Sequence, residues 1–233
     1  MARHPRLAVA NAVYHVLNRG NNHQVIFIDN KDSQYFIEKL KEVKEKYQCK
    51  LYSYVLMPNH IHLLIEPLIA QDMAKFMKAI TQRYGQYINK KYERTGTLWE
   101  GRYKSCLVSK DDYFITCCKY IEMNPVRAGI VSKPEEYQWS SYNIKIGMKN
   151  NYLLDSDIWC ETLGKNNKER EEKYKELFDE IMTESKLKEI RESIIKNKIY
   201  GSDGFKKEIE GKFGCKIETK KKVRPENEPV PNF

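Results

Sequence analysis

The stretch Leu51-Tyr-Ser-Tyr-Val-Leu-Met-Pro-Asn-His-Ile-His-Leu-Leu-Ile-Glu66 decides the fold of this chain. It contains two largely apolar segments, Leu51–Leu56 and His60–Glu66, on either side of Met57-Pro58-Asn59. A proline inside a sheet removes a hydrogen bond of the ladder, so it marks a break between strands. The sequence therefore predicts two consecutive strands here.

The chain before this stretch predicts one strand and one helix. The segment Ala12–Leu17 alternates enough to be a strand, and it ends at the turn-prone residues 18–22. Asp32 or Ser33 can cap the helix that follows. The apolar side chains of this helix recur at helical spacing, so one face should pack on a sheet. They are Phe36, Leu40, Val43 and Tyr47.

The chain after the stretch predicts a helix, a strand and a further helix. Apolar residues between positions 73 and 88 keep a spacing of three and four, which is typical of an amphipathic helix. A strand is expected near Tyr103–Val108. Ser109 opens a pattern like a capping box, so the last helix should run over Asp112–Met123. Asn124-Pro125 should end it, because the residue before a proline disfavours helical geometry.

The order of these elements is the split βαβ pattern. It predicts an α+β fold, namely a ferredoxin-like antiparallel sheet with helices on one face. Residues 1–150 form the main domain in this interpretation. The charge-dense residues 151–218 carry apolar positions at helical spacing and predict a small helical C-terminal appendage. Residues 219–233 combine a basic run with three prolines and predict a disordered tail.

Positive charge is concentrated in the first two thirds of the chain. The formal net charge is +9. Residues 1–150 carry 23 Lys and Arg against 14 Asp and Glu, whereas residues 151–233 carry 18 of each kind. A polyanion such as nucleic acid is therefore expected to bind the first two thirds.

The cysteines and the hydropathy point to the cytoplasm. None of the six cysteines lies in a Cys-x-x-Cys pair, which argues against a zinc site or a disulfide framework. The sequence shows neither a signal peptide nor a run of eighteen apolar residues. We therefore expect a cytoplasmic protein with reduced thiols.

The triplet His60-Ile61-His62 is the first candidate for chemistry. Side chains two residues apart on a strand point to the same face, so the two imidazoles project together while Ile61 faces the core. Two neutral imidazoles are a partial site for a divalent cation. Paired histidines on an exposed sheet face are also common without a metal, and a site needs a third ligand.

The predicted helix Asp112–Met123 supplies the second candidate. Tyr120 lies beside the apolar stripe of this helix, and Asn124 follows one turn later on nearly the same side. If this flank faces the histidine strand, Tyr120 offers a phenol nucleophile beside a cation that Asn124 completes. Glu122 lies about 200° around the helix from Tyr120, so it should point away. A tyrosine at such a position is ordinarily a packing residue, and the chain contains 16 tyrosines.

Four motifs, in this order, resemble those of the HUH single-tyrosine transposases, and in particular their REP-associated branch. They are Tyr14-His-Val-Leu-Asn-Arg-Gly20, Val55-Leu-Met-Pro-Asn-His-Ile-His-Leu-Leu-Ile65, Gly96-Thr-Leu-Trp-Glu-Gly-Arg-Tyr-Lys-Ser105 and Tyr113-Phe-Ile-Thr-Cys-Cys-Lys-Tyr-Ile-Glu-Met-Asn-Pro-Val-Arg-Ala-Gly129. Each motif alone is weak, but the ordered set is specific. The C-terminal third is less diagnostic.

The resemblance implies that His60 and His62 bind Mg²⁺ or Mn²⁺, that Asn124 is the third ligand, and that Tyr120 is the nucleophile. Other members of the superfamily use Gln at the third position. Asn124 is shorter by one methylene, so we expect it to bind after a helix shift or through water. The implied activity is that of a transposase, a single-stranded DNA endonuclease and strand transferase with a 5′-phosphotyrosine intermediate.

The resemblance also implies the partners. The expected substrate is a hairpin of a repetitive palindromic element flanked by single-stranded DNA. Members of the REP-associated branch tend to complete the site within one chain, so a monomer is favoured over a homodimer.

Basic and aromatic side chains near these motifs are candidates for DNA contact, since cations bind phosphates and aromatic rings stack on unpaired bases. Arg102 and Lys104 share one face of a strand that leads into the tyrosine helix. The full set is Arg83, Trp99, Arg102, Lys104, Lys119 and Arg127, with Tyr84 as a further stacking candidate.

Two other classes of function compete. A non-catalytic single-stranded nucleic-acid-binding module would keep the fold but would need neither the histidine pair nor the tyrosine, and both are present. A two-histidine phosphoesterase would need a second His-x-Ser/Thr-like element, which His4, His15 and His23 do not provide.

Overall fold

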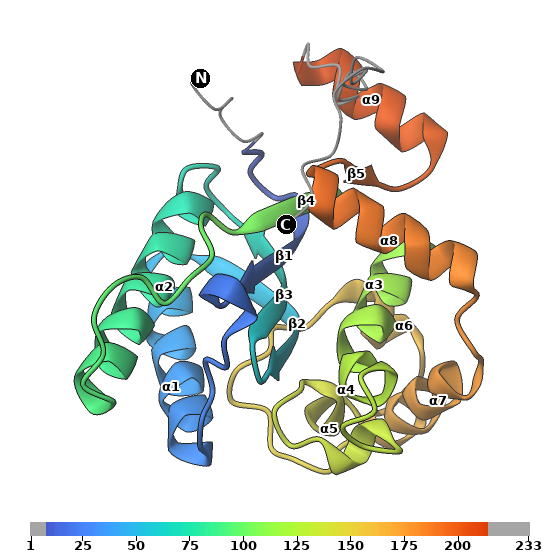
Figure 1. The fold of residues 1–233 in the computed structure, drawn as a ribbon. Helices are drawn as coiled ribbons and strands as arrows, with labels where there is room; N and C mark the ends of the chain where they lie inside the picture. Colours follow the sequence, from blue (N-terminus) through green and yellow to red (C-terminus); the bar gives the residue numbers. More distant parts are fainter. Residues whose placement is uncertain (1–7, 214–233) are drawn as a thin grey trace, which may run out of the picture.

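The computed structural model describes residues 8–213. The predicted tail at 219–233 and Cys215 lie outside the described residues. The mixed α+β class is confirmed, because strands and helices share one fold (Figure 1). The strands are β1 (Val13–Arg19), β2 (Cys49–Met57), β3 (His60–Pro67), β4 (Lys104–Val108) and β5 (Ile199–Tyr200). The helices are α1 (Asn30–Lys46), α2 (Asp72–Lys91), α3 (Asp112–Glu122), α4 (Asn124–Arg127), α5 (Tyr142–Lys145), α6 (Ile158–Thr162), α7 (Asn167–Asp179), α8 (Glu184–Lys196) and α9 (Asp203–Phe213).

The five strands form one sheet in the order β2-β3-β1-β4-β5. The first four pair antiparallel, and β5 adds to β4 in parallel. The order of the first four strands is the one that a split βαβ chain produces. The histidine strand β3 therefore lies inside the sheet, and its His62 stands opposite Leu17 of β1.

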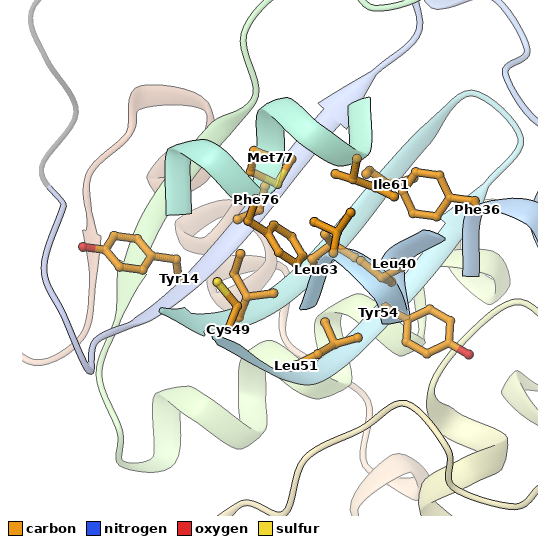
Figure 2. Packing of buried hydrophobic residues seen from close by; sticks show 14 of the residues in the cluster. Tyr14, Phe36, Leu40, Cys49, Leu51, Tyr54, Ile61, Leu63, Phe76 and Met77 are labelled. Atoms are coloured by element: carbon orange, nitrogen blue, oxygen red, sulfur yellow. The ribbon is translucent and has the colours of Figure 1, made fainter. Parts of the chain in front are cut away.

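Helices cover both faces of the sheet, so the prediction of helices on one face is wrong. α1 and α2 pack on one face, and α3 and α8 pack on the other (Figure 1). The reason is that alternate residues of the inner strands are apolar in both directions. Ile61 and Leu63 of β3 face the first layer, whereas Leu64 faces the second. Figure 2 shows Phe76 and Met77 of α2 over Leu63.

The residues that cap the helices differ from the predicted ones by a few positions, although α3 begins at Asp112 as predicted. Asp29, not Asp32 or Ser33, caps α1. Its side chain accepts from the Asp32 backbone, and the Asp32 side chain returns the bond in a capping box. Asp111 caps α3 by accepting from the Tyr113 backbone at 3.1 Å. Short polar side chains follow one another at both starts, so spacing alone did not identify the cap.

The tyrosine helix α3 ends at Glu122, but a second short helix, α4, begins two residues later. α3 runs to Glu122, Met123 takes φ −82° and ψ 0°, and Asn124 begins the short helix α4 with Pro125 in its first turn. Proline is tolerated there, because the first turn of a helix needs no donor from it. Asn124 is thereby kept close to the end of the tyrosine helix.

The C-terminal segment is built into the main sheet. β5 extends the sheet beside β4, and α8 buries Leu187, Ile190 and Ile194 in the same cluster as α3. The segment contains a strand that the expected helical appendage did not include. No helix within residues 8–213 combines the length and apolar character needed to cross a lipid bilayer.

A buried polar cluster joins α3 to the helix α7. The Glu122 carboxylate is fully buried and accepts from Ser53 at 3.0 Å and from Tyr174 at 2.8 Å. It also accepts from Ser141, and Lys145 lies 3.5 Å away. Glu122 thus faces this cluster, as its position around the helix predicted.

Other segments of the chain pair with the two outer strands of the antiparallel part of the sheet, β2 and β4. On the β4 side the border is β5. On the β2 side, the Leu56 backbone donates to Trp139 at 2.9 Å, and the Ser141 backbone donates to Tyr54 at 2.9 Å.

Candidate functional site

The Tyr120 phenol lies against two imidazoles. Tyr120 projects from α3 onto the sheet, and only 6% of the residue is exposed. Its ring centroid is 5.9 Å from that of His62 and 5.7 Å from that of His15, with edge-to-face geometry in both cases. The helix flank that the sequence predicted to face the histidine strand does face it.

His60 and His62 project together from β3. Their ring centroids are 5.1 Å apart. Burial lowers the pKa of His60 to about 4 and lowers the pKa of His62 well below its ordinary value. Both imidazoles are therefore neutral at pH 7, which is the state that binds a metal ion.

His15 belongs to the same cluster, although the sequence did not single it out. Its Nε2 lies 2.7 Å from His62 Nδ1, and the residue is fully buried. Burial lowers the pKa of His15 to about 3. The available signal was the pairing of β1 with β3, because His15 lies two residues from Leu17, the partner of His62. Sequence alone does not specify which strands are neighbours.

The hydrogen bonds at Nδ1 leave the Nε2 atoms of the pair for other use. His60 Nδ1 lies 2.6 Å from the Asn59 side-chain oxygen, so Nδ1 carries the proton and donates. In the tautomer in which His62 donates from Nδ1 to His15, the His62 Nε2 lone pair is likewise left for a cation. Metal-binding histidines are commonly held in this way, with the second ring nitrogen donating to a neighbouring group.

Asn124 fits the third position by its chemistry. Its amide nitrogen is buried and has no hydrogen-bond partner among the described residues. An unpaired buried N–H donor is costly, and an acceptor oxygen of a bound substrate would relieve that cost. A cation would instead be bound by the side-chain oxygen of Asn124, since an amide binds hard cations through its oxygen. Across residues 8–213, no three His, Cys, Asp or Glu side chains gather in a way that could hold a metal. The side-chain oxygen of Asn124 remains the predicted third ligand.

Two arginines adjoin Tyr120. The Arg127 guanidinium carbon lies 4.3 Å from the centroid of the Tyr120 ring, and Arg127 also donates to the Tyr120 carbonyl at 2.6 Å. Burial raises the pKa of the Tyr120 phenol, and the charges of Arg127 and of Arg191 on α8 oppose that shift. Arg127 is thus a half-buried neighbour of the tyrosine rather than one of a set of surface cations.

Arg102 and Lys104 lie close to the histidine pair. Together with Arg19 they line a hollow of about 180 Å³ at the ends of β1 and β4. Arg19 stands opposite His60 in the sheet, which places the hollow beside the histidine pair. Arg19 lies in the Tyr14–Gly20 motif but was not predicted as a DNA-contacting residue.

Two other basic DNA candidates, Arg83 and Lys119, contact protein groups away from the histidine pair. Arg83 belongs to α2, on the opposite face of the sheet from Tyr120, and pairs with Glu42 at 3.1 Å. Lys119 donates to the carbonyls of Leu177 and Glu180 at the end of α7.

The aromatic candidates for base stacking are buried. Trp99 is 8% exposed and donates from its indole to Thr81 at 2.9 Å. Tyr84 is fully buried and donates to Ile26 at 2.7 Å. Their rings serve the core, because each polar atom finds a backbone partner there.

The fold and the family of the chain agree. A family model described as IS200-like transposase matches residues 8–124, which hold the sheet strands β1 to β4 and the tyrosine helix. The match spans half of the chain, and the chain belongs to the IS200-like transposase family. The membership predicted from the four motifs is confirmed.

Two proteins that are similar to this chain are both described as REP-associated tyrosine transposases. A curated protein of Haemophilus influenzae, named "Putative REP-associated tyrosine transposase", is 25% identical over an alignment of 137 residues. The alignment covers 51% of this chain and 77% of that protein. A solved structure of a REP-associated tyrosine transposase bound to a REP hairpin superposes with a TM-score of 0.55 at 13% identity. The superposition covers 68% of this chain and 99% of that chain, and it shows a shared fold.

Proposed function

We propose that this transposase cuts and rejoins single-stranded DNA through a covalent bond to Tyr120. The observation that carries the proposal is the phenol ring of Tyr120 packed edge-on against His62, 5.9 Å away, on a helix that a separate part of the chain supplies. A module that only binds DNA would not need this convergence of a nucleophile with neutral imidazoles.

His60 and His62 would hold Mg²⁺ or Mn²⁺ through their Nε2 atoms, and the buried amide of Asn124 would complete the protein ligands. When bound, the cation would neutralise charge on the non-bridging oxygens of the scissile phosphate. His15 would orient His62 through the 2.7 Å bond between their ring nitrogens. This proposal does not depend on a carboxylate ligand.

The chemical step of the proposal is a transfer at phosphorus. The Tyr120 hydroxyl oxygen forms a bond to phosphorus while the bond from phosphorus to the 3′ oxygen breaks. The leaving oxygen keeps the electron pair, takes up a proton and becomes a 3′-OH. The phenol loses its proton, and the 5′ end remains attached as a phosphotyrosine that stores the bond for rejoining. Burial raises the pKa of Tyr120, so nearby positive charge has to assist this deprotonation.

The proposed substrate is a DNA hairpin flanked by a single strand. The solved relative with the same fold is described as bound to a REP hairpin. In this chain, the hollow lined by Arg19, Arg102 and Lys104 is the best-placed route for the single strand, because it lies next to the histidine pair. The phenol and the imidazoles meet within one chain, which supports a monomer as the active form.

The test uses a labelled hairpin oligonucleotide with a single-stranded flank, incubated with the full-length protein and Mn²⁺. A covalent protein–DNA adduct that resists denaturation should form with the wild type and vanish with Tyr120→Phe or with EDTA. Tyr113→Phe is the matched control, since Tyr113 lies on the same helix but packs its ring against Tyr200. An adduct in the Tyr120→Phe variant would assign the nucleophile elsewhere. Hairpin binding without any adduct would favour the non-catalytic module.

A further inference from the structure

Two guanidinium groups from distant parts of the sequence meet at the candidate nucleophile. Arg127 reaches Tyr120 from the turn after the tyrosine helix, and its guanidinium lies over the phenol ring. Arg191 lies on α8, in the C-terminal segment, next to Ile190, which is buried in the same cluster as Tyr120. Its positive charge acts on the phenol and opposes the rise in the pKa of Tyr120 that burial causes. The family match ends at residue 124, so both arginines lie beyond the part of the chain that defines the family.

Among residues 8–213, the positive charge at this point is only partly balanced by a carboxylate, that of Glu184. Arg127 and Arg191 repel each other, and burial together with this repulsion lowers the pKa of Arg127 to about 10, despite the opposing effect of the phenol. Arg191 pairs with Glu184 at 3.1 Å, but the two side chains are 47% and 78% exposed. Exposed ion pairs are weak, so Glu184 leaves most of the positive potential in place. Two cations held together beside a nucleophile favour an anion between them.

We propose that Arg191, together with Arg127, binds the phosphate that Tyr120 attacks, so that the C-terminal helix α8 completes the reaction site. The inference rests on the proposed function of Tyr120 and adds the group that receives the scissile phosphate. Arginine suits this role, because its planar fork of donors can bind two phosphate oxygens at once. Part of Arg191 is open to solvent, as a residue that contacts DNA must be.

A purely structural role for Arg191 makes different predictions. Its ion-pair partner among the described residues is Glu184, on the first turn of the same helix, and both side chains are exposed. Loss of an exposed ion pair changes stability little. A structural role therefore predicts nearly unchanged rates in Arg191 variants, whereas phosphate binding predicts slower adduct formation in a protein of normal stability.

The first experiment measures the rate of adduct formation at saturating hairpin and Mn²⁺. Arg191→Ala should slow the rate by about 10- to 100-fold, the usual effect of removing one charged hydrogen-bond donor from a reacting phosphate. Arg191→Lys should recover part of the loss, since it restores the charge but not the fork. Glu184→Gln should leave the rate equal to or above that of the wild type. Lys188→Ala removes an exposed charge from the same helix and should have no effect. Equal rates for Arg191→Ala and wild type would overturn the proposal.

The second experiment needs no cleavage. The side-chain Nε–H signals of arginine are followed by NMR in metal-free protein, with EDTA present, as the hairpin oligonucleotide is added. The Arg191→Ala and Arg127→Ala variants identify the two signals by their disappearance. As hairpin is added, the chemical shifts of both signals should change until the protein is saturated. The titration is repeated with oligonucleotides in which one phosphate of the flank at a time is an uncharged methylphosphonate. The changes in chemical shift should disappear for one of these positions, which identifies the bound phosphate.

The two experiments separate this inference from the function on which it rests. Shifts without any wild-type adduct would refute the covalent reaction and keep the phosphate site. An adduct without a change in the signal of either arginine would support the covalent reaction and refute the phosphate site.

Discussion

His15 illustrates what a single residue adds to the site. It is fully buried, contacts His62 at 2.7 Å and lies 5.7 Å from Tyr120 between ring centroids. Its Nδ1 is buried without a partner among the described residues, which is a cost that a purely structural position would tend to avoid. The hydrogen bond between His15 and His62 would offset that cost by keeping the His62 ring in the tautomer that can bind a metal ion.

We predict that His15→Leu lowers the affinity for Mn²⁺ by about 10- to 100-fold, the usual effect of removing the group that orients a metal-binding histidine. His15→Gln retains a hydrogen-bond acceptor and should lose less. Electron paramagnetic resonance of free Mn²⁺ provides the measurement. His23→Ala, at an exposed histidine, is the control. If His15→Leu and the wild type bind Mn²⁺ with equal affinity, His15 contributes only to packing and does not orient His62.

For single residues, the sequence predicted the direction of a side chain wherever the regular repeat of a strand or helix determines it. The side chains of His60 and His62 share a face because strand residues alternate, and Tyr120 faces them because helix residues advance by a fixed angle. His15 and Arg191 were missed because they reach the site through pairing between distant segments. The burial of Trp99 was not predicted, because burial depends on the surrounding helices, which no local pattern contains.

The tyrosine helix α3 is the element that the chemistry depends on most. Asp111 fixes its start by accepting from the Tyr113 backbone, and Ser109 holds Asp111 in place at 2.8 Å. The existence of the helices was predictable from apolar spacing, while their caps were displaced by a few residues. The second helical layer was not predicted, because an apolar residue on a strand does not reveal which partner covers it.

Removal of the α3 cap tests the importance of this start. Asp111→Ala should lower the free energy of unfolding by about 1 kcal/mol, since a backbone donor loses its acceptor. Asp111→Asn should stay within a few tenths of a kcal/mol of the wild type, because Asn caps helices comparably. Urea denaturation measures both. An alanine variant as stable as the asparagine variant would show that water replaces the cap.

The molecule as a whole is more unified than the predicted division at residue 150 suggests. Ile190 of α8 is fully buried in the cluster that holds Tyr120, and Tyr174 of α7 donates to Glu122 of the tyrosine helix. The predicted domain boundary remains a prediction about independent folding. The contacts favour one cooperative unit.

Ile190→Ala should therefore destabilise the entire chain. We expect a loss of about 2–4 kcal/mol, typical of removing a large aliphatic side chain from a core. Ile195→Ala, at a residue 49% exposed on the same helix, should change stability by less than about 0.5 kcal/mol. Circular dichroism and tryptophan fluorescence should report one coincident transition in urea. Two separate transitions would instead show that the C-terminal segment folds by itself.

The segments that border β2 and β4 have a consequence for assembly. A sheet with an open outer strand offers unpaired backbone groups to any other extended chain, which invites fibre growth and strand exchange. Here residues 139–141 occupy part of one margin and β5 occupies part of the other. The polypeptide thus covers part of its own sheet on both sides. Fewer backbone groups are left for a second copy of the chain to pair with, which disfavours association of copies strand to strand.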